Sequence, residues 1–134
     1  MDRVLVDTGG WFAHFNAGDP DHSAVDSVLM EWEGRLLTSD YIFDELVTLV
    51  RYRVGHSEAC KIGDVLRNGG LAKWVDIKPC DRDSAWRRFA RDRDKSYSFT
   101  DCTSFAIMDR LGIATAVAVD EDFRRAGYHV LPDL

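Results

Sequence analysis

Cysteine is scarce in this 134-residue sequence, and its placement argues against two common kinds of small domain. The three cysteines, Cys60, Cys80 and Cys102, form no Cys-x-x-Cys pair. An odd number of widely spaced cysteines does not fit a disulfide framework or a zinc site. The four histidines also lack metal-ligand spacing. We therefore expect the cysteines to be buried free thiols in a reducing cytosol.

Long apolar runs are absent as well. The longest run, around residues 116–119, is far shorter than the roughly 20 residues that a membrane-spanning helix needs. The amino terminus, Met1-Asp2-Arg3-Val4, has no apolar signal region. We expect a soluble cytoplasmic protein that does not interact with membranes.

Basic residues do not predominate. The chain has 17 Lys and Arg against 23 Asp and Glu, a net charge of −6, which by itself argues against a nucleic-acid partner. However, six basic residues fall within residues 82–95. A net-negative protein can still bind RNA when its acids are concentrated at a metal site and its bases line the approach.

Apolar residues make up 46% of the chain, and their spacing alternates between strand and helix patterns. We expect an α/β fold, a three-layer α/β/α sandwich with a mostly parallel central sheet of four to five strands, in one domain over residues 1–134. Asp40, Ser57 and Asp81 are the expected helix caps. The predicted strands cover 4–6, 35–38, 74–77, 114–119 and 128–131, and the predicted helices cover 8–15, 23–32, 40–54, 57–67, 81–93 and 98–111.

Four acidic residues occupy positions that favour a shared site. Asp7 directly follows the first predicted strand and Asp120 the fourth, and open α/β sheets bind ligands beyond the carboxyl ends of such strands. Glu45 and Asp101 lie in the early turns of two helices. Because helix N-termini favour negative charge, we expect Asp7 and Asp101 to stay ionised.

Carboxylates gathered in one cleft need a cation. Two unit charges about 4 Å apart repel by about 4 kcal/mol at an effective dielectric constant near 20. Carboxylate oxygens suit Mg²⁺ or Mn²⁺, and such an ion can also bind phosphate oxygens and activate water.

Each acid also has a structural interpretation that the sequence leaves open. Asp101 completes the helix-capping pattern Ser98-Phe99-Thr100-Asp101. Glu45 could lie on a solvated helix face, and Asp120 could belong to an ordinary acidic turn. Asp7 is the hardest to dismiss, because an acid at the end of a buried strand is costly unless it is capped or used.

Four motifs in order resemble the PIN-domain family and, within it, the VapC-type toxins of toxin–antitoxin pairs. The resemblance covers essentially the whole chain. One departure is Gly9-Gly10, which should add flexibility to the first helical turn. The motifs are Val4-Leu5-Val6-Asp7-Thr8, Asp44-Glu45-Leu46-Val47-Thr48-Leu49, Ser98-Phe99-Thr100-Asp101-Cys102-Thr103-Ser104-Phe105-Ala106 and Ala118-Val119-Asp120-Glu121-Asp122-Phe123.

The resemblance implies a PIN-like fold and an endoribonuclease that uses Mg²⁺, with Mn²⁺ as a substitute. It implies a VapB-type antitoxin as partner, and a homodimer. Residues 97–106 are similar to a subset of these toxins that cleave the ribosomal sarcin–ricin loop, whereas many relatives cut transfer RNA. The implied catalytic metal ligands are Asp7, Glu45, Asp101 and Asp120, with Asp122 as a further ligand and Thr8 as a supporting hydrogen-bond donor.

Several arginines are candidate RNA contacts. Arg87, Arg88 and Arg91, with Trp86 and Phe89 between them, could hold phosphates and stack a base. The alternative is an amphipathic helix with both aromatic residues in the core and its arginines in solvent. Further candidates are Arg51 and Arg53, which follow the Glu45 motif.

Other function classes remain as alternatives. Asp7-Thr8-Gly9 is also the tripeptide of aspartic proteases, but these are all-β enzymes in which two aspartates share a proton. A haloacid-dehalogenase-like phosphatase needs a second Asp where this chain has Gly9. A housekeeping RNA-processing nuclease and a binding domain without turnover are the remaining alternatives.

Overall fold

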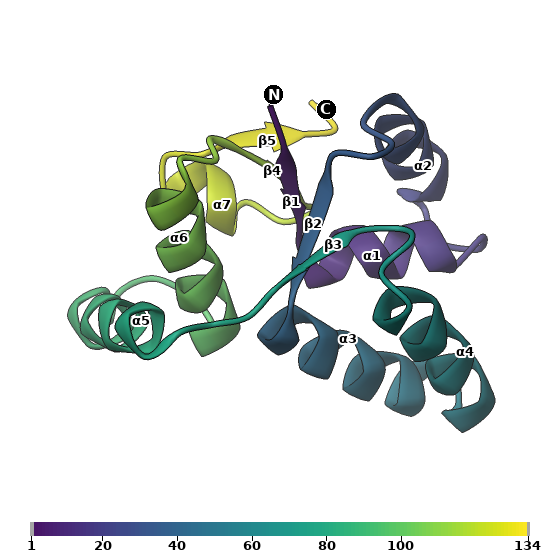
Figure 1. Cartoon of the computed structure of the whole chain (residues 1–134), viewed down its shortest axis with the longest axis horizontal. Helices are drawn as coiled ribbons and strands as arrows, with labels where there is room; N and C mark the ends of the chain where they lie inside the picture. The colour runs from purple at the N-terminus through teal and green to yellow at the C-terminus, as the bar shows by residue number, and fades with distance from the viewer. Residues whose placement is uncertain (1, 134) are drawn as a thin grey trace.

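The computed structural model describes residues 2–133, and a five-stranded sheet lies at its centre. The strand order is β3-β2-β1-β4-β5, and all four pairings are parallel (Figure 1). This confirms the predicted α/β class and parallel sheet. The strands are β1 (Val4–Val6), β2 (Leu36–Ser39), β3 (Lys73–Val75), β4 (Thr115–Val117) and β5 (His129–Leu131).

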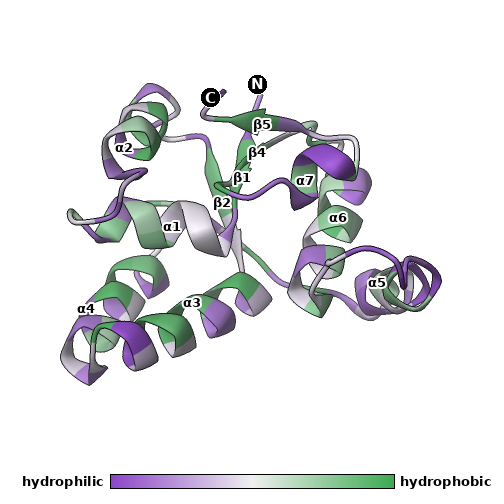
Figure 2. Ribbon diagram, turned by 180° about the vertical axis from the view of Figure 1, so that it is seen from behind, coloured by the Kyte–Doolittle hydropathy of each residue, from purple (hydrophilic) through white to green (hydrophobic). Residues whose placement is uncertain are grey.

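Helices cover both faces of the sheet, as Figures 1 and 2 show from opposite sides. The chain runs from β1 outward to β3 and then crosses back to β4 and β5. Because such crossovers are right-handed, the reversal of direction moves the later helices to the opposite face. One face carries α1 (Thr8–Phe15), α2 (His22–Glu31), α3 (Asp40–Arg53) and α4 (His56–Arg67), and the other carries α5 (Pro79–Arg91), α6 (Phe99–Leu111) and α7 (Asp122–Arg125).

The core lies between these layers. Every residue of β1 is fully buried, and so is the large side chain of Trp11 on α1. On the other face, α6 buries eight residues, including Phe105. In Figure 2 the central strands are largely hydrophobic, whereas the helices around them mix hydrophobic and hydrophilic residues. A central strand covered on both faces reads as a continuous apolar run, which explains Val4-Leu5-Val6.

Three predicted helix caps are wrong. Ser39, not Asp40, caps α3: its hydroxyl accepts a hydrogen bond from the Ile42 amide at 3.1 Å. Asp40 instead begins the helix and accepts from the Ile77 amide at 3.0 Å, which ties α3 to the segment after β3. Helix α4 begins one residue before Ser57, after Gly55, which has a φ of 148° that favours glycine.

Helix α5 begins earlier than predicted and exposes its two aromatic side chains. Asp81 lies in its first turn and accepts from the Lys78 amide at 2.9 Å, so it is not the cap residue. Asp81 and Ala85 are buried, whereas Trp86 and Phe89 are 61% and 40% exposed. The interpretation that places both aromatic residues in the core is therefore wrong.

The reason lies in what α5 packs against. The guanidinium of Arg88 lies 4.6 Å from the ring centre of Phe105 and 5.7 Å from that of Tyr97. A planar guanidinium packs favourably on an aromatic face. The inner side of α5 is therefore filled by polar side chains with partners on α6 and the preceding loop, and its aromatic side chains face outward.

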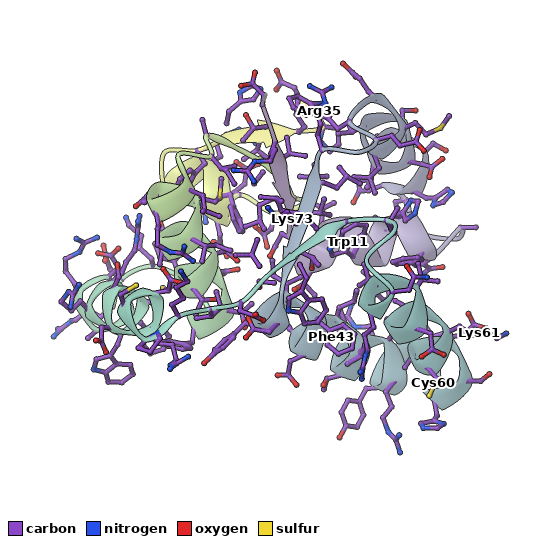
Figure 3. The ribbon with its side chains drawn as sticks, in the orientation of Figure 1. Trp11, Arg35, Phe43, Cys60, Lys61 and Lys73 are labelled. Carbon is purple, nitrogen blue, oxygen red and sulfur yellow. The ribbon has the colours of Figure 1, made fainter. Side chains whose placement is uncertain are left out.

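The cysteines divide into two environments. Cys102 is buried, as expected, but Cys60 and Cys80 are exposed free thiols. Figure 3 shows Cys60 on the outer side of α4, beside Lys61. Exposure contradicts the predicted burial of these two thiols, because both lie on the outward sides of surface helices. Across residues 2–133, none of the helices has the length and apolar character required to cross a bilayer.

Candidate active site

The reversal of strand order falls between β1 and β4, and Asp7 lies at that point. It follows β1 directly and occupies the cap position of α1, and its backbone amide donates to the Val117 carbonyl at 2.9 Å. The side chain is only 4% exposed. Its Oδ1 atom is buried and has no hydrogen-bond partner among the described residues. A buried, unpaired carboxylate oxygen is costly unless something absent from the protein chain, such as a cation, satisfies it.

Close packing explains one member of the glycine pair after Thr8. A Cβ atom on Gly10 would lie 2.8 Å from the Val117 carbonyl oxygen, so a larger residue would push α1 away from β4. A Cβ atom on Gly9 would meet only the Val119 side chain, which is 42% exposed and can rotate away. This close approach is a packing reason for glycine at position 10, and the expected flexibility of the first helical turn stays a prediction.

We expect Gly10→Ala to destabilise the protein by about 1–3 kcal/mol, the usual cost of overpacking against an immobile group. Urea unfolding measures this loss. Gly9→Ala is the matched control and should cost much less, because its neighbour is a mobile methyl group. Equal unfolding midpoints for the two variants would contradict the close approach of α1 to β4.

Thr8 holds Glu45 at this end of the sheet. The Thr8 hydroxyl donates to Glu45 Oε1 at 2.6 Å, joining α1 to α3. Thr8 is buried and Glu45 is half-buried, while the neighbouring Asp44 is exposed. Glu45 is therefore not on a solvated face, and Thr8 makes the kind of supporting hydrogen bond that the resemblance implies.

Asp101 combines a structural contact with a place at the site. The Ser98 amide donates to Asp101 Oδ2 at 3.0 Å, and the Asp101 amide donates to the Ser98 hydroxyl at 3.0 Å. This reciprocal pair is a capping box at the start of α6. Only Oδ2 takes part in it. The capping interpretation is therefore correct for Asp101 Oδ2, whereas Oδ1 takes no part in the capping box.

The acidic turn after β4 presents Asp120 and Asp122 in different ways. Asp120 Oδ1 accepts from the Asp122 amide at 3.0 Å, which shapes the turn. Asp122 Oδ1 accepts from the Ser96 hydroxyl at 2.8 Å. Ser96 was not among the predicted site residues, because a serine 26 residues away gives no local sequence signal.

Burial and mutual repulsion act together on Asp7. Burial raises the pKa of Asp7 well above its usual range, and the charge of Asp101 raises it further. The charges of Asp120 and Glu45 act in the same direction. Four carboxylates distant in sequence therefore interact electrostatically at this end of the sheet.

The same causes act on Asp101. Burial raises its pKa to about 7, against the opposing hydrogen bond from the Ser98 amide, and the charges of Asp120, Asp122 and Glu45 contribute to the rise. Burial also raises the pKa of Asp120. Desolvation therefore outweighs the helix dipole at both residues, so the helix N-termini do not hold the pKa values of Asp7 and Asp101 low as expected.

This donor set fits a hard divalent cation. The side chains offer carboxylate oxygens, one of them buried and unpaired, and the pKa values of Asp7, Asp101 and Asp120 are raised, as expected when a positive charge is missing. In the described part of the chain, no three His, Cys, Asp or Glu side chains are close enough to form a ready-made metal cluster. A Mg²⁺ ion fits this looser arrangement, because it needs one or two carboxylates and keeps several waters.

The five predicted RNA-contacting arginines have different surroundings. Arg51 and Arg87 are exposed. Arg53 lies 5.8 Å from the ring centre of Phe12, and Arg91 donates to Asp92 at 2.7 Å. Arg88 is turned inward onto aromatic rings, as described above. The structure therefore does not gather these arginines into one patch.

Comparisons with known proteins agree with this geometry. The PIN domain family matches residues 4–127. VapC20 of Mycobacterium tuberculosis, named a 23S rRNA-specific endonuclease, is 33% identical over 125 residues, which cover 93% of this chain and 95% of the relative. Ribonuclease VapC26 of the same species is 26% identical over 117 residues, covering 87% and 86%.

Solved structures show the same likeness. The crystal structure of M. tuberculosis VapC20, described as a sarcin–ricin loop cleaving toxin, superposes with a TM-score of 0.88 at 32% identity and covers 93% of this chain and 95% of that one. DNA-bound VapBC from Salmonella typhimurium has a TM-score of 0.71 at 12% identity, with 97% of each chain covered, and shares the fold. The chain belongs to the PIN-domain family and, within it, to the VapC-type ribonucleases.

Proposed function

We propose that this protein is a metal-dependent endoribonuclease that cleaves the sarcin–ricin loop of 23S ribosomal RNA as the toxin of a type II toxin–antitoxin pair. The observation that carries the proposal is the buried Asp7 carboxylate, with an unpaired oxygen at the strand-order reversal and three further acids acting on it. Phosphodiester cleavage needs positive charge at such a place, since charge develops on the phosphate oxygens.

The residues that would hold Mg²⁺, or Mn²⁺ in its place, are Asp7 and Asp101, with Glu45 and Asp120 binding directly or through water. Asp7 offers its unpaired oxygen, and Asp101 the oxygen outside its capping box. Thr8 keeps Glu45 oriented. When bound, the ion supplies Lewis-acid stabilisation of the phosphate and activation of water. Asp122, held by Ser96, is the more peripheral acid, because its charge raises the pKa of Asp101 but is not among the main causes of the raised pKa of Asp7.

The substrate follows from two likenesses. VapC20, at 33% identity, is named for 23S rRNA, and residues 97–106 resemble the motif of sarcin–ricin loop cleaving toxins. By the same resemblance, a VapB-type antitoxin would cover the acidic cleft, and the toxin would form a homodimer. Transfer RNA and a housekeeping RNA are the alternative substrates within the same chemistry.

The fold argues against the protease alternative. Aspartic proteases are all-β, whereas helices follow the strands of this sheet. The Asp7-Thr8-Gly9 tripeptide instead ends a strand and begins a helix here. The catalytic pair of those enzymes therefore has no counterpart in this architecture.

We expect purified protein to cut ribosomal RNA once, within the sarcin–ricin loop, when Mg²⁺ or Mn²⁺ is present. EDTA should stop cleavage, and excess Mg²⁺ should restore it, because the site needs a cation. Primer extension on 23S RNA locates the cut, and Asp44→Asn, which removes the exposed acid beside Glu45, is the active control. Cleavage that survives EDTA would contradict the metal site, and cleavage of transfer RNA alone would contradict the target.

A further inference from the structure

Four aromatic side chains form a continuous strip beside the acidic site. Phe99, the first residue of α6, lies at its centre, with its ring centre 6.1 Å from Tyr41 on α3 and 6.1 Å from Phe89 on α5. Trp86 lies 6.4 Å from Phe99 and stacks on Phe89 at 5.8 Å, with 22° between the rings. We call Tyr41, Phe99, Trp86 and Phe89 the aromatic strip.

The strip leaves large ring surfaces in water. Trp86 is 61% exposed and Phe89 is 40% exposed, although α5 also carries polar residues that could have faced solvent. Instead, α5 buries Asp81 and turns Arg88 inward. The other two members of the strip are half-buried and also pack against the core, so they support the exposed pair from below. An exposed, stacked aromatic pair on a folded domain marks a binding surface, because leaving it in water has an energetic cost.

The strip is continuous with the acidic site through two helices. Phe99 is two residues before Asp101 in the first turn of α6, and Tyr41 is one helical turn before Glu45 on α3. Residues four apart lie on the same side of a helix. Tyr41 therefore lies on the same side of α3 as Glu45. Phe99 and Asp101, two residues apart, share the first turn of α6 but not a face. With a phosphate at the acids, we expect the neighbouring bases of an RNA strand to extend from Glu45 toward Tyr41 and the rest of the strip.

Two exposed arginines on α5, against the one exposed acid Asp83 between Arg82 and Trp86, favour a polyanion over an apolar partner beside the strip. Arg82 lies one helical turn before Trp86, and Arg87 lies directly after it, and both are exposed. Arg82 donates one guanidinium N–H to the Ile77 carbonyl. Arg87 has no salt bridge or side-chain hydrogen bond within residues 2–133. Aromatic rings flanked by guanidinium groups suit unpaired RNA, whose bases stack while its phosphates bind the cations.

We propose that the aromatic strip is a stacking platform for unpaired bases of the RNA loop next to the scissile phosphate. This inference rests on the proposed ribonuclease function and adds the residues that select a loop over a duplex. In a duplex the bases stack on each other and do not offer free faces. The strip would therefore act on substrate binding, and the acids on the chemical step.

The test measures binding of a fluorescein-labelled hairpin RNA that contains the sarcin–ricin loop. The protein is the full chain with Asp7→Asn, which keeps the RNA intact. We expect Trp86→Ala to weaken binding roughly 10-fold and Trp86→Phe to restore most of it, because any aromatic face can stack. Tyr52→Ala is the matched control, since Tyr52 is 83% exposed at the far end of α3 and lies outside the strip.

Two further arms separate stacking from other roles. With abasic sites in place of the loop bases, Trp86→Ala should lose its effect, because no base remains to stack. In the cleavage-competent chain, the same change should raise KM and leave kcat unchanged. Unchanged RNA binding by Trp86→Ala would overturn the platform and leave the nuclease standing, and no binding of the hairpin by the parent would overturn both. Light scattering that shows Trp86→Ala separating a dimer would also overturn the platform, because a second copy would then be the occupant.

Discussion

Asp7→Asn is expected to abolish RNA cleavage and, at the same time, to stabilise the metal-free protein. The loss should be at least about 10²-fold, because a metal that stabilises the transition state by several kcal/mol would lose its buried ligand. The gain in stability follows from removing a buried group whose charged form is disfavoured. Cleavage of labelled loop RNA measures the first effect, and thermal melts in EDTA measure the second.

The pH dependence gives this prediction a definite sign. Between the pKa of an unfolded Asp, about 3.9, and the raised pKa of folded Asp7, the folded state binds more protons than the unfolded state. The stability of the metal-free wild type therefore falls as pH rises through this window. The stability of Asp7→Asn does not fall for this reason, because the variant has no carboxyl group at position 7. We expect the variant to melt roughly 3–5 °C higher at pH 8 and at the same temperature near pH 4.

Metal addition provides the control. Mg²⁺ should raise the melting temperature of the wild type at pH 8 and have a much smaller effect on Asp7→Asn, because a ligand stabilises only the state that binds it. Variant activity equal to wild type would refute the assignment of Asp7. A variant that is less stable than wild type in EDTA at pH 8 would contradict the buried, unpaired carboxylate.

Asp81→Ala is expected to destabilise the fold by about 2–4 kcal/mol, because it removes one partner of a buried ion pair. Arg110 on α6 donates to both oxygens of Asp81, at 2.8 and 2.9 Å, and Asp81 is only 2% exposed. The change also leaves the Lys78 amide without its acceptor. Arg110 is 28% exposed, so water relieves part of the cost. Urea unfolding measures the effect.

Asp83→Ala is the matched control, since Asp83 is an exposed acid in the same helix and its removal should be nearly neutral. Burial alone would raise the pKa of Asp81. The hydrogen bonds from Arg110 and Lys78 together lower it by more than burial raises it, so the net shift is downward. The stabilisation is therefore present above pH 4 and is lost as pH falls through the folded pKa. Similar unfolding midpoints for Asp81→Ala and Asp83→Ala would argue that the pair contributes nothing.

Local patterns were sufficient for the class of the fold and for the places of the acids. An apolar run such as Val4-Leu5-Val6 predicts a buried strand, because the spacing of apolar residues can be recognised from neighbouring positions in the chain alone. The rule that ligands bind at the carboxyl ends of parallel strands then indicated Asp7 and Asp120 as neighbours. The structure places both at that end of the sheet, where the charge of Asp120 raises the pKa of Asp7.

The helix caps could not be predicted from local patterns in the same way. Ser39 and Asp40 are both good cap residues, and the sequence does not say which of them begins the helix. The Ile77 amide, 37 residues away, binds the Asp40 carboxylate, so Ser39 is the residue that caps the helix. When two adjacent residues can both cap a helix, a hydrogen-bond partner distant in the chain decides which of them does so.

By itself, the sequence determined that strands alternate with helices and that Asp7 and Asp120 lie beyond the ends of two strands, since both depend on neighbours along the chain. Tertiary structure alone decided that α5 turns Arg88 inward and Trp86 outward, because Phe105 and Arg110, the partners of its inner face, lie in another helix. It also decided the raised pKa of Asp7, since desolvation and the field of distant carboxylates exist only once the chain has folded.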